Sequence, residues 1–192
     1  MNWSLLLLAL SVGVVHTLRG PDHYLPLLGL AKARDWSLRR ALGMTVACGL
    51  VHCASSFLVL AVAMSLLGSV AGIAWGTQIA AAGLIATGLA LAVTGLRAPR
   101  ERAFSLAFVL VFALGPCEWL LPSGAAAWAE GGFGAALLVS LAFSLATTLT
   151  MAAMVAVGMV GLPRVALGWR RAAHGLAGAV CVGCGLAMWV GL

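Results

Sequence analysis

The chain has 192 residues, of which 63% are hydrophobic and only 8% are charged, whereas soluble domains carry roughly 25% charged residues. Its 11 Lys and Arg and 5 Asp and Glu cannot cover a water-facing surface. The composition therefore excludes a soluble enzyme, a disordered chain and a nucleic-acid-binding protein, despite a net charge of +6. It predicts a polytopic membrane protein with room for about six helices of roughly 20–25 residues, joined by short loops and with no extramembrane domain.

Long uncharged runs locate the predicted spans, which must be helices because lipid offers the backbone no hydrogen-bonding partner. Residues 41–96 contain no charged residue and are too long for one span, and Gly68-Ser69 provides a turn signal in their middle. The first span is predicted at about 4–30 and is broken at Gly20-Pro21. The other five are predicted at about 39–67, 71–96, 103–122, 132–160 and 171–192.

All 11 cations lie in or near alternate connections between the predicted spans. The second and fourth connections contain none, and the fourth contains Glu130. Cations concentrate in cytoplasmic loops, so this pattern predicts an inner-membrane protein, as in bacteria, with both termini outside the cytoplasm. The cations of the first, third and fifth connections are Arg19, Lys32, Arg34, Arg39 and Arg40; Arg97, Arg100 and Arg102; and Arg164, Arg170 and Arg171.

Three patterns recur in the two halves of the chain. Residues 20–26 and 115–122 both read Gly-Pro, two ligand-capable residues, an aromatic residue, Leu and a following Pro. The other matches pair His52–Ser56 with Ser144–Thr148, and Gly88-Leu89-Ala90 with Gly185-Leu186-Ala187.

Each half holds three predicted helices. Because three is an odd number of membrane crossings, the second half enters the membrane from the opposite side and is inverted relative to the first. The sequence thus predicts one transmembrane domain, 1–192, built as a 3+3 inverted repeat (about 1–98 and 99–192) with Gly-Pro breaks in the first and fourth spans. This architecture is typical of secondary transporters.

Ionisable residues gather at the predicted breaks, and such residues inside a membrane indicate function because burying them is costly. His16 and His23 are two helical turns apart and share a face if the helix continues. Imidazole nitrogen with one carboxylate suits borderline ions such as Ni²⁺, Co²⁺ or Zn²⁺, whereas Ca²⁺ and Mg²⁺ require more carboxylates. The predicted metal ligands are His16, Asp22, His23 and His52, and the predicted transport path contains Ser55, Ser56, Cys117, Glu118, Thr147 and Thr148.

Structural interpretations of the same residues stay open. Each His can be a hydrogen-bonded packing residue, and Asp22 can form an ion pair with Arg19. His174 lies near two arginines and is interpreted as an interfacial residue. The five cysteines all lie in predicted spans, which excludes a secreted disulfide framework. Cys181-x-x-Cys184 lacks a second ligand pair and is interpreted as packing.

The pattern His16-x-x-x-Gly20-x-Asp22-His23 resembles the signature of nickel/cobalt permeases of the NicO/NiCoT type, with the spacing of the HupE/UreJ-type nickel permeases. His52-x-x-Ser55-Ser56 is similar to a second element of those families. The Pro-flanked Cys117 resembles that of the CcdA/DsbD electron carriers, whose fold is related, as is that of LysE-type transporters. An additional His-rich motif of HupE-type proteins and a His-rich cytoplasmic loop are missing.

The resemblance and the ionisable residues together predict a secondary permease for nickel or cobalt, not an enzyme, with no permanently bound cofactor. No Walker motif is present, so ATP coupling would need a partner protein. The expected partners are the lipid bilayer, the transported ion and, in a homo-oligomer, further copies of the chain; nucleic acid is not among them. Two alternatives remain: a thiol–disulfide carrier that uses Cys117, and an exporter of small anions or organic solutes with the same fold.

Overall fold

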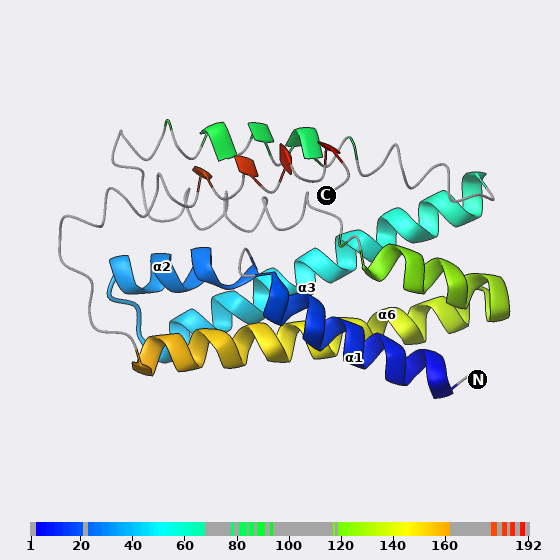
Figure 1. The fold of residues 1–192 in the computed structure, drawn as a ribbon, viewed down its shortest axis with the longest axis horizontal. Coiled ribbons are helices and arrows are strands. Elements are labelled where there is room, and N and C mark those ends of the chain that lie inside the picture. The colour runs from blue at the N-terminus through cyan, green and yellow to red at the C-terminus, as the bar shows by residue number, and fades with distance from the viewer. Residues whose placement is uncertain are drawn as a thin grey trace.

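The computed structural model describes residues 3–20, 23–67, 117 and 119–161. It also describes short stretches of the remainder, namely 78, 81–83, 85–86, 88–90, 93, 178–179, 182–183, 185–186 and 189–190. The regular elements of the described residues are all helices, with no strand among them (Figure 1). This confirms the all-α class.

The predicted first span is two helices, α1 (Trp3–Arg19) and α2 (Leu25–Ala33). The predicted break at Gly20-Pro21 is therefore confirmed: α1 ends at Arg19, and a second Pro lies at the start of α2. A Pro at the start of a helix needs no partner for its missing N–H and has a backbone angle that suits the helix. Figure 1 shows α2 displaced from the axis of α1, beyond the end of that helix.

Helix α3 (Leu38–Val62) continues into a π-helical turn, η2 (Ala63–Leu67). Its first turn is capped by Ser37, whose hydroxyl accepts a hydrogen bond from the backbone N–H of Arg40. Together α3 and η2 match the span predicted at 39–67.

Helix α6 (Leu120–Gly161) is a hairpin of two arms that meet at Gly131 and Gly132 (Figure 1). Gly132 has φ +65° and ψ −158°, a conformation that residues with a side chain rarely adopt. The expected loop at 123–131 is wrong, as is the expected end of the fourth span at 122, because residues 120–130 form the short arm. Pro122 lies in the first turn of this helix, where the missing N–H has no helical partner, and so it does not end a span.

Two helices, at Leu38–Leu66 and Leu120–Gly161, are long and apolar enough to cross a membrane by length and composition. The first coincides with the span predicted at 39–67, and the long arm of the second coincides with the span at 132–160. The spans predicted at 71–96, 103–122 and 171–192 lie mostly outside the described residues.

The long arm of α6 packs against both α1 and α3 (Figure 1). Small residues permit the close approach. A Cβ built on Gly13 would lie 2.9 Å from the carbonyl oxygen of Phe143, and one built on Gly49 would lie 2.8 Å from the hydroxyl of Thr148. Glycines that let helix backbones approach one another are typical of membrane proteins.

We expect Gly13→Ala to lower the thermal stability of the purified protein, because the added Cβ meets backbone that cannot rotate away. Overpacking of this kind costs about 1–3 kcal/mol. Gly43→Ala is the matched control, since nothing lies within 4 Å of a Cβ at that position. A melting curve in detergent should shift down for Gly13→Ala alone, and equal melting temperatures would contradict the packing described.

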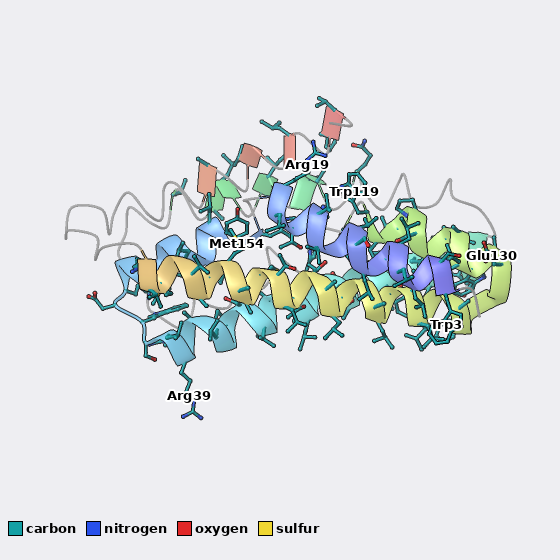
Figure 2. All side chains as sticks on the ribbon, turned by 60° about the horizontal axis from the view of Figure 1, so that its bottom comes forward. Trp3, Arg19, Arg39, Trp119, Glu130 and Met154 are labelled. Carbon is teal, nitrogen blue, oxygen red and sulfur yellow. The ribbon has the colours of Figure 1, made fainter. Side chains whose placement is uncertain are left out.

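The helices enclose two apolar clusters. The α2 cluster contains Leu27, Leu30, Ala31, Trp36, Ala41, Cys48, Met151 and Val155. The hairpin cluster contains Ala9, Cys53, Leu60, Ala63, Cys117, Leu120, Leu121, Ala127, Ala136, Val139 and Phe143. Figure 2 shows Trp3 and Glu130 at one end of the molecule and Arg39 toward the other. Three of the four predicted ligands, His16, His23 and His52, are among the described residues.

Candidate metal centre

Three of the predicted ligands meet where the first span is broken. His16 lies in the last turn of α1, His23 follows the break, and His52 lies in the middle of α3. The Nε2 atoms of His16 and His23 are 3.1 Å apart. The rings of His23 and His52 lie edge to face with their centroids 5.5 Å apart. The structure therefore brings residues of two separate helices and the break into one centre.

The sequence argument for pairing His16 with His23 gave the right pair for the wrong reason. It assumed a continuous helix, in which seven residues advance about 10 Å along the axis. The helix does not continue. It ends at Arg19, and the two imidazoles on either side of the break lie within hydrogen-bonding distance.

The carbonyl of Gly20, which follows the end of α1, holds His23 in place. It accepts a hydrogen bond from the His23 backbone N–H at 3.1 Å and lies 3.2 Å from the His23 Nδ1 atom. A carbonyl cannot donate, so Nδ1 must carry the proton of this bond. In the neutral ring Nε2 then has an open lone pair, and it is Nε2 that lies next to His16. Histidines that bind metals are usually oriented in this way, with the other ring nitrogen donating to a carbonyl or carboxylate.

Cys117 joins the second half of the chain to this centre. Its Sγ atom lies 3.5 Å from the Nε2 atom of His16, and its backbone N–H donates to the Ser56 hydroxyl at 2.8 Å. The same hydroxyl donates to the carbonyl of His52 at 2.7 Å. Ser56 therefore ties the turn of α3 that carries His52 to the residue that follows the second Gly-Pro.

The described parts of the two Gly-Pro segments thus meet, since His23 and Cys117 both contact His16. In an inverted repeat, broken helices of the two halves are expected to lie at the interface between the repeats. Asp22 and Glu118, the acidic members of the predicted centre, lie outside the described residues, and so does His174.

Hydroxyl groups line the neighbouring turns. Ser55 donates to the His52 carbonyl at 2.8 Å. The hydroxyls of Thr147 and Thr148 are buried and make no hydrogen bond to the described residues. Thr147 packs against Gly13 and Thr148 against Gly49, and each glycine precedes a centre histidine by three residues. The predicted path residues of α6 therefore lie about one helical turn from His16 and His52.

Two of the three histidines are buried, and His16 is half-buried. His23 and His52 are 7% and 6% exposed. The rings of Phe143 and Trp119 lie 6.0 Å and 6.1 Å from that of His16, measured between centroids. Sequence reasoning noted Trp119 only as the aromatic residue of the second Gly-Pro pattern, and it missed Phe143, which only the packing of α6 against α1 reveals.

As the side chains stand, the described residues contain no group of three or more His, Cys, Asp and Glu that could hold a metal ion. The imidazoles are in contact with one another, so an ion has to separate them in order to bind.

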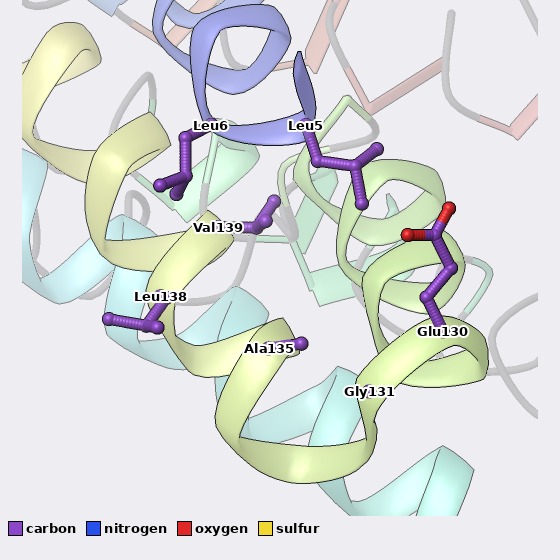
Figure 3. Close-up of a pocket in the computed structure, with 7 residues that line it drawn as sticks. All are labelled: Leu5, Leu6, Glu130, Gly131, Ala135, Leu138 and Val139. Carbon is purple, nitrogen blue, oxygen red and sulfur yellow. The ribbon is translucent and has the colours of Figure 1, made fainter. Parts of the chain in front are cut away.

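A separate hollow of about 400 Å³ lies at the end of the molecule where the α6 hairpin turns. Its wall is apolar, with Leu5 and Leu6 of α1 facing Val139 of α6, and the carboxylate of Glu130 stands beside Leu5 (Figure 3). Leu6, the lining residue of α1 nearest to His16, precedes it by ten residues, or about 15 Å along a helix, so the hollow is no part of the histidine centre.

Comparisons of the chain with protein-family models, with curated proteins and with solved structures gave no match.

Proposed function

We propose that the protein is a secondary permease for a divalent transition-metal ion, nickel or cobalt by resemblance of its motifs. One observation carries the proposal. His16, His23 and His52 converge with Cys117 at a break between helices, in a buried centre between two apolar clusters. Buried ionisable groups at a helix break mark the substrate sites of many transporters.

In the proposed centre, His23 is the anchor ligand because the Gly20 carbonyl fixes its ring. His16, His52 and Asp22 complete the ligand set, and the hydroxyls of Thr147 and Thr148 line the path. The freed carbonyls at the break and the imidazoles together replace part of the water that the ion loses. Imidazole-rich sites suit nickel, cobalt and zinc better than magnesium or calcium.

Access would alternate by a rocking of one half of the chain against the other. The α2 cluster closes the centre on the side of Arg39, and the hairpin cluster closes it on the side of Glu130. Packing of Leu28 of α2 against Gly158, and the bond from the Lys32 ammonium to the Met159 carbonyl at 2.8 Å, hold α2 against the end of α6.

The six spans and the inverted repeat belong to the same proposal. The contact of His16 with both His23 and Cys117 supports the repeat. Contacts between described residues of the third predicted span of each half, at 71–96 and 171–192, support it as well. A Cβ built on Gly185 would lie 2.6 Å from Ile85, and the Gln78 amide donates to the Trp189 carbonyl at 3.4 Å. Helices that occupy equivalent places in the two halves are expected to pack in this way around a pseudo-twofold axis.

The proposed orientation places both termini and the Gly131-Gly132 turn outside the cytoplasm. We expect a compartment-sensitive reporter inserted after Gly132 to report the extracytoplasmic side, and one inserted after Asp35 to report the cytoplasm. Arg34, Arg39 and Arg40 flank the second position, and cations favour the cytoplasmic side. Reversed readings would contradict the orientation, and equal readings would contradict the crossing of the membrane by α3.

Transport is tested with purified protein in vesicles that contain a nickel-sensitive fluorescent chelator. The permease should give saturable nickel entry that competing cobalt reduces and magnesium leaves unchanged. Entry no faster than in protein-free vesicles, in both orientations of the gradient, would overturn the proposal.

The contact of the Cys117 thiol with an imidazole also favours a second candidate, a membrane thiol–disulfide carrier. Cys48, Cys53 and Cys117 form no disulfide with one another. A variant that keeps Cys117 as its only cysteine decides between the two functions. It cannot form an internal disulfide, so a carrier would lose all activity, whereas a permease would retain nickel transport.

A further inference from the structure

We propose that Cys117 is a direct ligand of the transported ion together with His16 and His23, so that the centre selects thiophilic ions. This inference rests on the proposed function and deepens it. The sequence analysis placed Cys117 on the transport path and not among the ligands.

Two of the three separations between these donor atoms are close to those that one shared ion requires. Zinc–nitrogen bonds of about 2.0–2.1 Å and zinc–sulfur bonds of about 2.3 Å place tetrahedral ligand pairs about 3.3 Å apart for two nitrogens and about 3.6 Å apart for nitrogen and sulfur. The observed separations are 3.1 Å between the two Nε2 atoms and 3.5 Å between Sγ and Nε2 of His16. Small rotations of the side chains would admit an ion between them.

The number of atoms around His16 also points to an ion. An imidazole nitrogen has a single in-plane direction for a hydrogen bond, as donor or as acceptor. Both the His23 nitrogen and the Cys117 sulfur lie within bonding distance of the Nε2 atom of His16. One hydrogen bond cannot serve both neighbours well, whereas an ion bound by all three atoms would.

The backbone fixes Cys117 for this role. Its N–H is held by Ser56, and its carbonyl accepts the N–H groups of Leu120 and Leu121 at 3.1 Å and 3.2 Å. The thiol is therefore positioned from both sides, and the Gly20 carbonyl positions His23 in the same way. On binding, the sulfur–metal bond replaces the S–H bond, and the proton leaves to the surrounding water.

A donor set of two imidazoles and one thiolate defines a class of substrate. Thiolate favours zinc, copper(I) and other thiophilic ions, imidazole favours nickel, cobalt, copper and zinc, and neither favours magnesium, calcium or manganese. The cargo is therefore expected to be an ion of the nickel, cobalt or zinc kind that tolerates sulfur.

Cobalt(II) is the probe, because a cobalt–thiolate bond gives a charge-transfer band in the near ultraviolet. The purified full-length chain is reduced, freed of metal and titrated with Co²⁺, with binding measured by absorbance and by metal analysis. Cys117→Ser is compared with Cys48→Ser, a change at an equally buried cysteine of the α2 cluster. A third variant keeps Cys117 as its only cysteine.

We expect the charge-transfer band in the unmodified protein, in Cys48→Ser and in the variant with Cys117 alone. Cys117→Ser should lack the band and bind Co²⁺ at least about tenfold more weakly. If Cys117→Ser fails to fold, the variant with Cys117 alone still decides, since absence of the band there overturns the proposal. Binding of Co²⁺ that depends on His23 but gives no band overturns the role of Cys117 and leaves the permease intact. Absence of any Co²⁺ binding contradicts both.

Discussion

His23→Ala is expected to abolish nickel transport while the protein still reaches the membrane. His23 is the residue on which the centre depends most. Its ring is fixed by the Gly20 carbonyl, contacts both His16 and His52, and is 7% exposed. Removing a partner at some distance from the metal typically weakens binding roughly 10–100-fold. Removing the ring itself should exceed that loss, because it takes away a nitrogen that binds the ion directly.

The measurement is accumulation of radioactive nickel in cells that express matched amounts of protein in the membrane. His174→Ala is the control, since that histidine is predicted at the interface and is expected to have little effect. His23→Gln adds a second comparison, because its amide can keep a hydrogen bond to the Gly20 carbonyl but is a poor ligand. Normal transport by His23→Ala would remove this residue from the proposed centre.

Ser56→Ala is expected to reduce transport without removing any ligand. The Ser56 hydroxyl accepts from the Cys117 N–H and donates to the His52 carbonyl, so it connects the two halves of the chain. Its loss leaves a buried N–H without an acceptor, at a cost of about 1–3 kcal/mol. Cys117 should then move, and nickel affinity should fall roughly 10–100-fold, as for other residues that orient ligands.

Ser11→Ala is the matched control for this prediction. Ser11 also donates to the carbonyl one turn before it, but it is exposed and touches no part of the centre. Nickel affinity is measured by titration of the purified variants. Ser56→Thr should restore much of the affinity, because its hydroxyl can make both bonds if the added methyl group fits. Equal affinities for Ser56→Ala and the unmodified protein would show that the connection does not orient the centre.

The sequence predicted the parts of the fold that depend on local rules. Gly20-Pro21 predicted the break, because a Pro removes a donor and clashes with the preceding turn. The uncharged run after Arg40 predicted α3 and η2 to within a few residues. The Gly-Pro repeat related Cys117 to the residues after the first break, and Cys117 lies against His16.

The rest depends on contacts that the sequence does not encode locally. Pro122 indicated the end of a helix but lies in the first turn of one, because its position depends on where the chain re-enters the bundle. The contact of Cys117 with His16 joins residues 101 positions apart and exists only because α6 packs against α1. Glycines at positions 13 and 49 give little signal in a chain with 24 glycines, although they set the approach of these helices.

The central claim is that His16, His23 and His52 form one metal-binding centre. The most direct measurement is the number of Ni²⁺ ions bound per purified full-length chain at equilibrium, determined by mass spectrometry of metals. The unmodified protein should bind one ion, and the variant with all three histidines replaced by Ala should bind none, with unchanged helical content. Equal binding by the two proteins, or none by the unmodified protein, would contradict the claim.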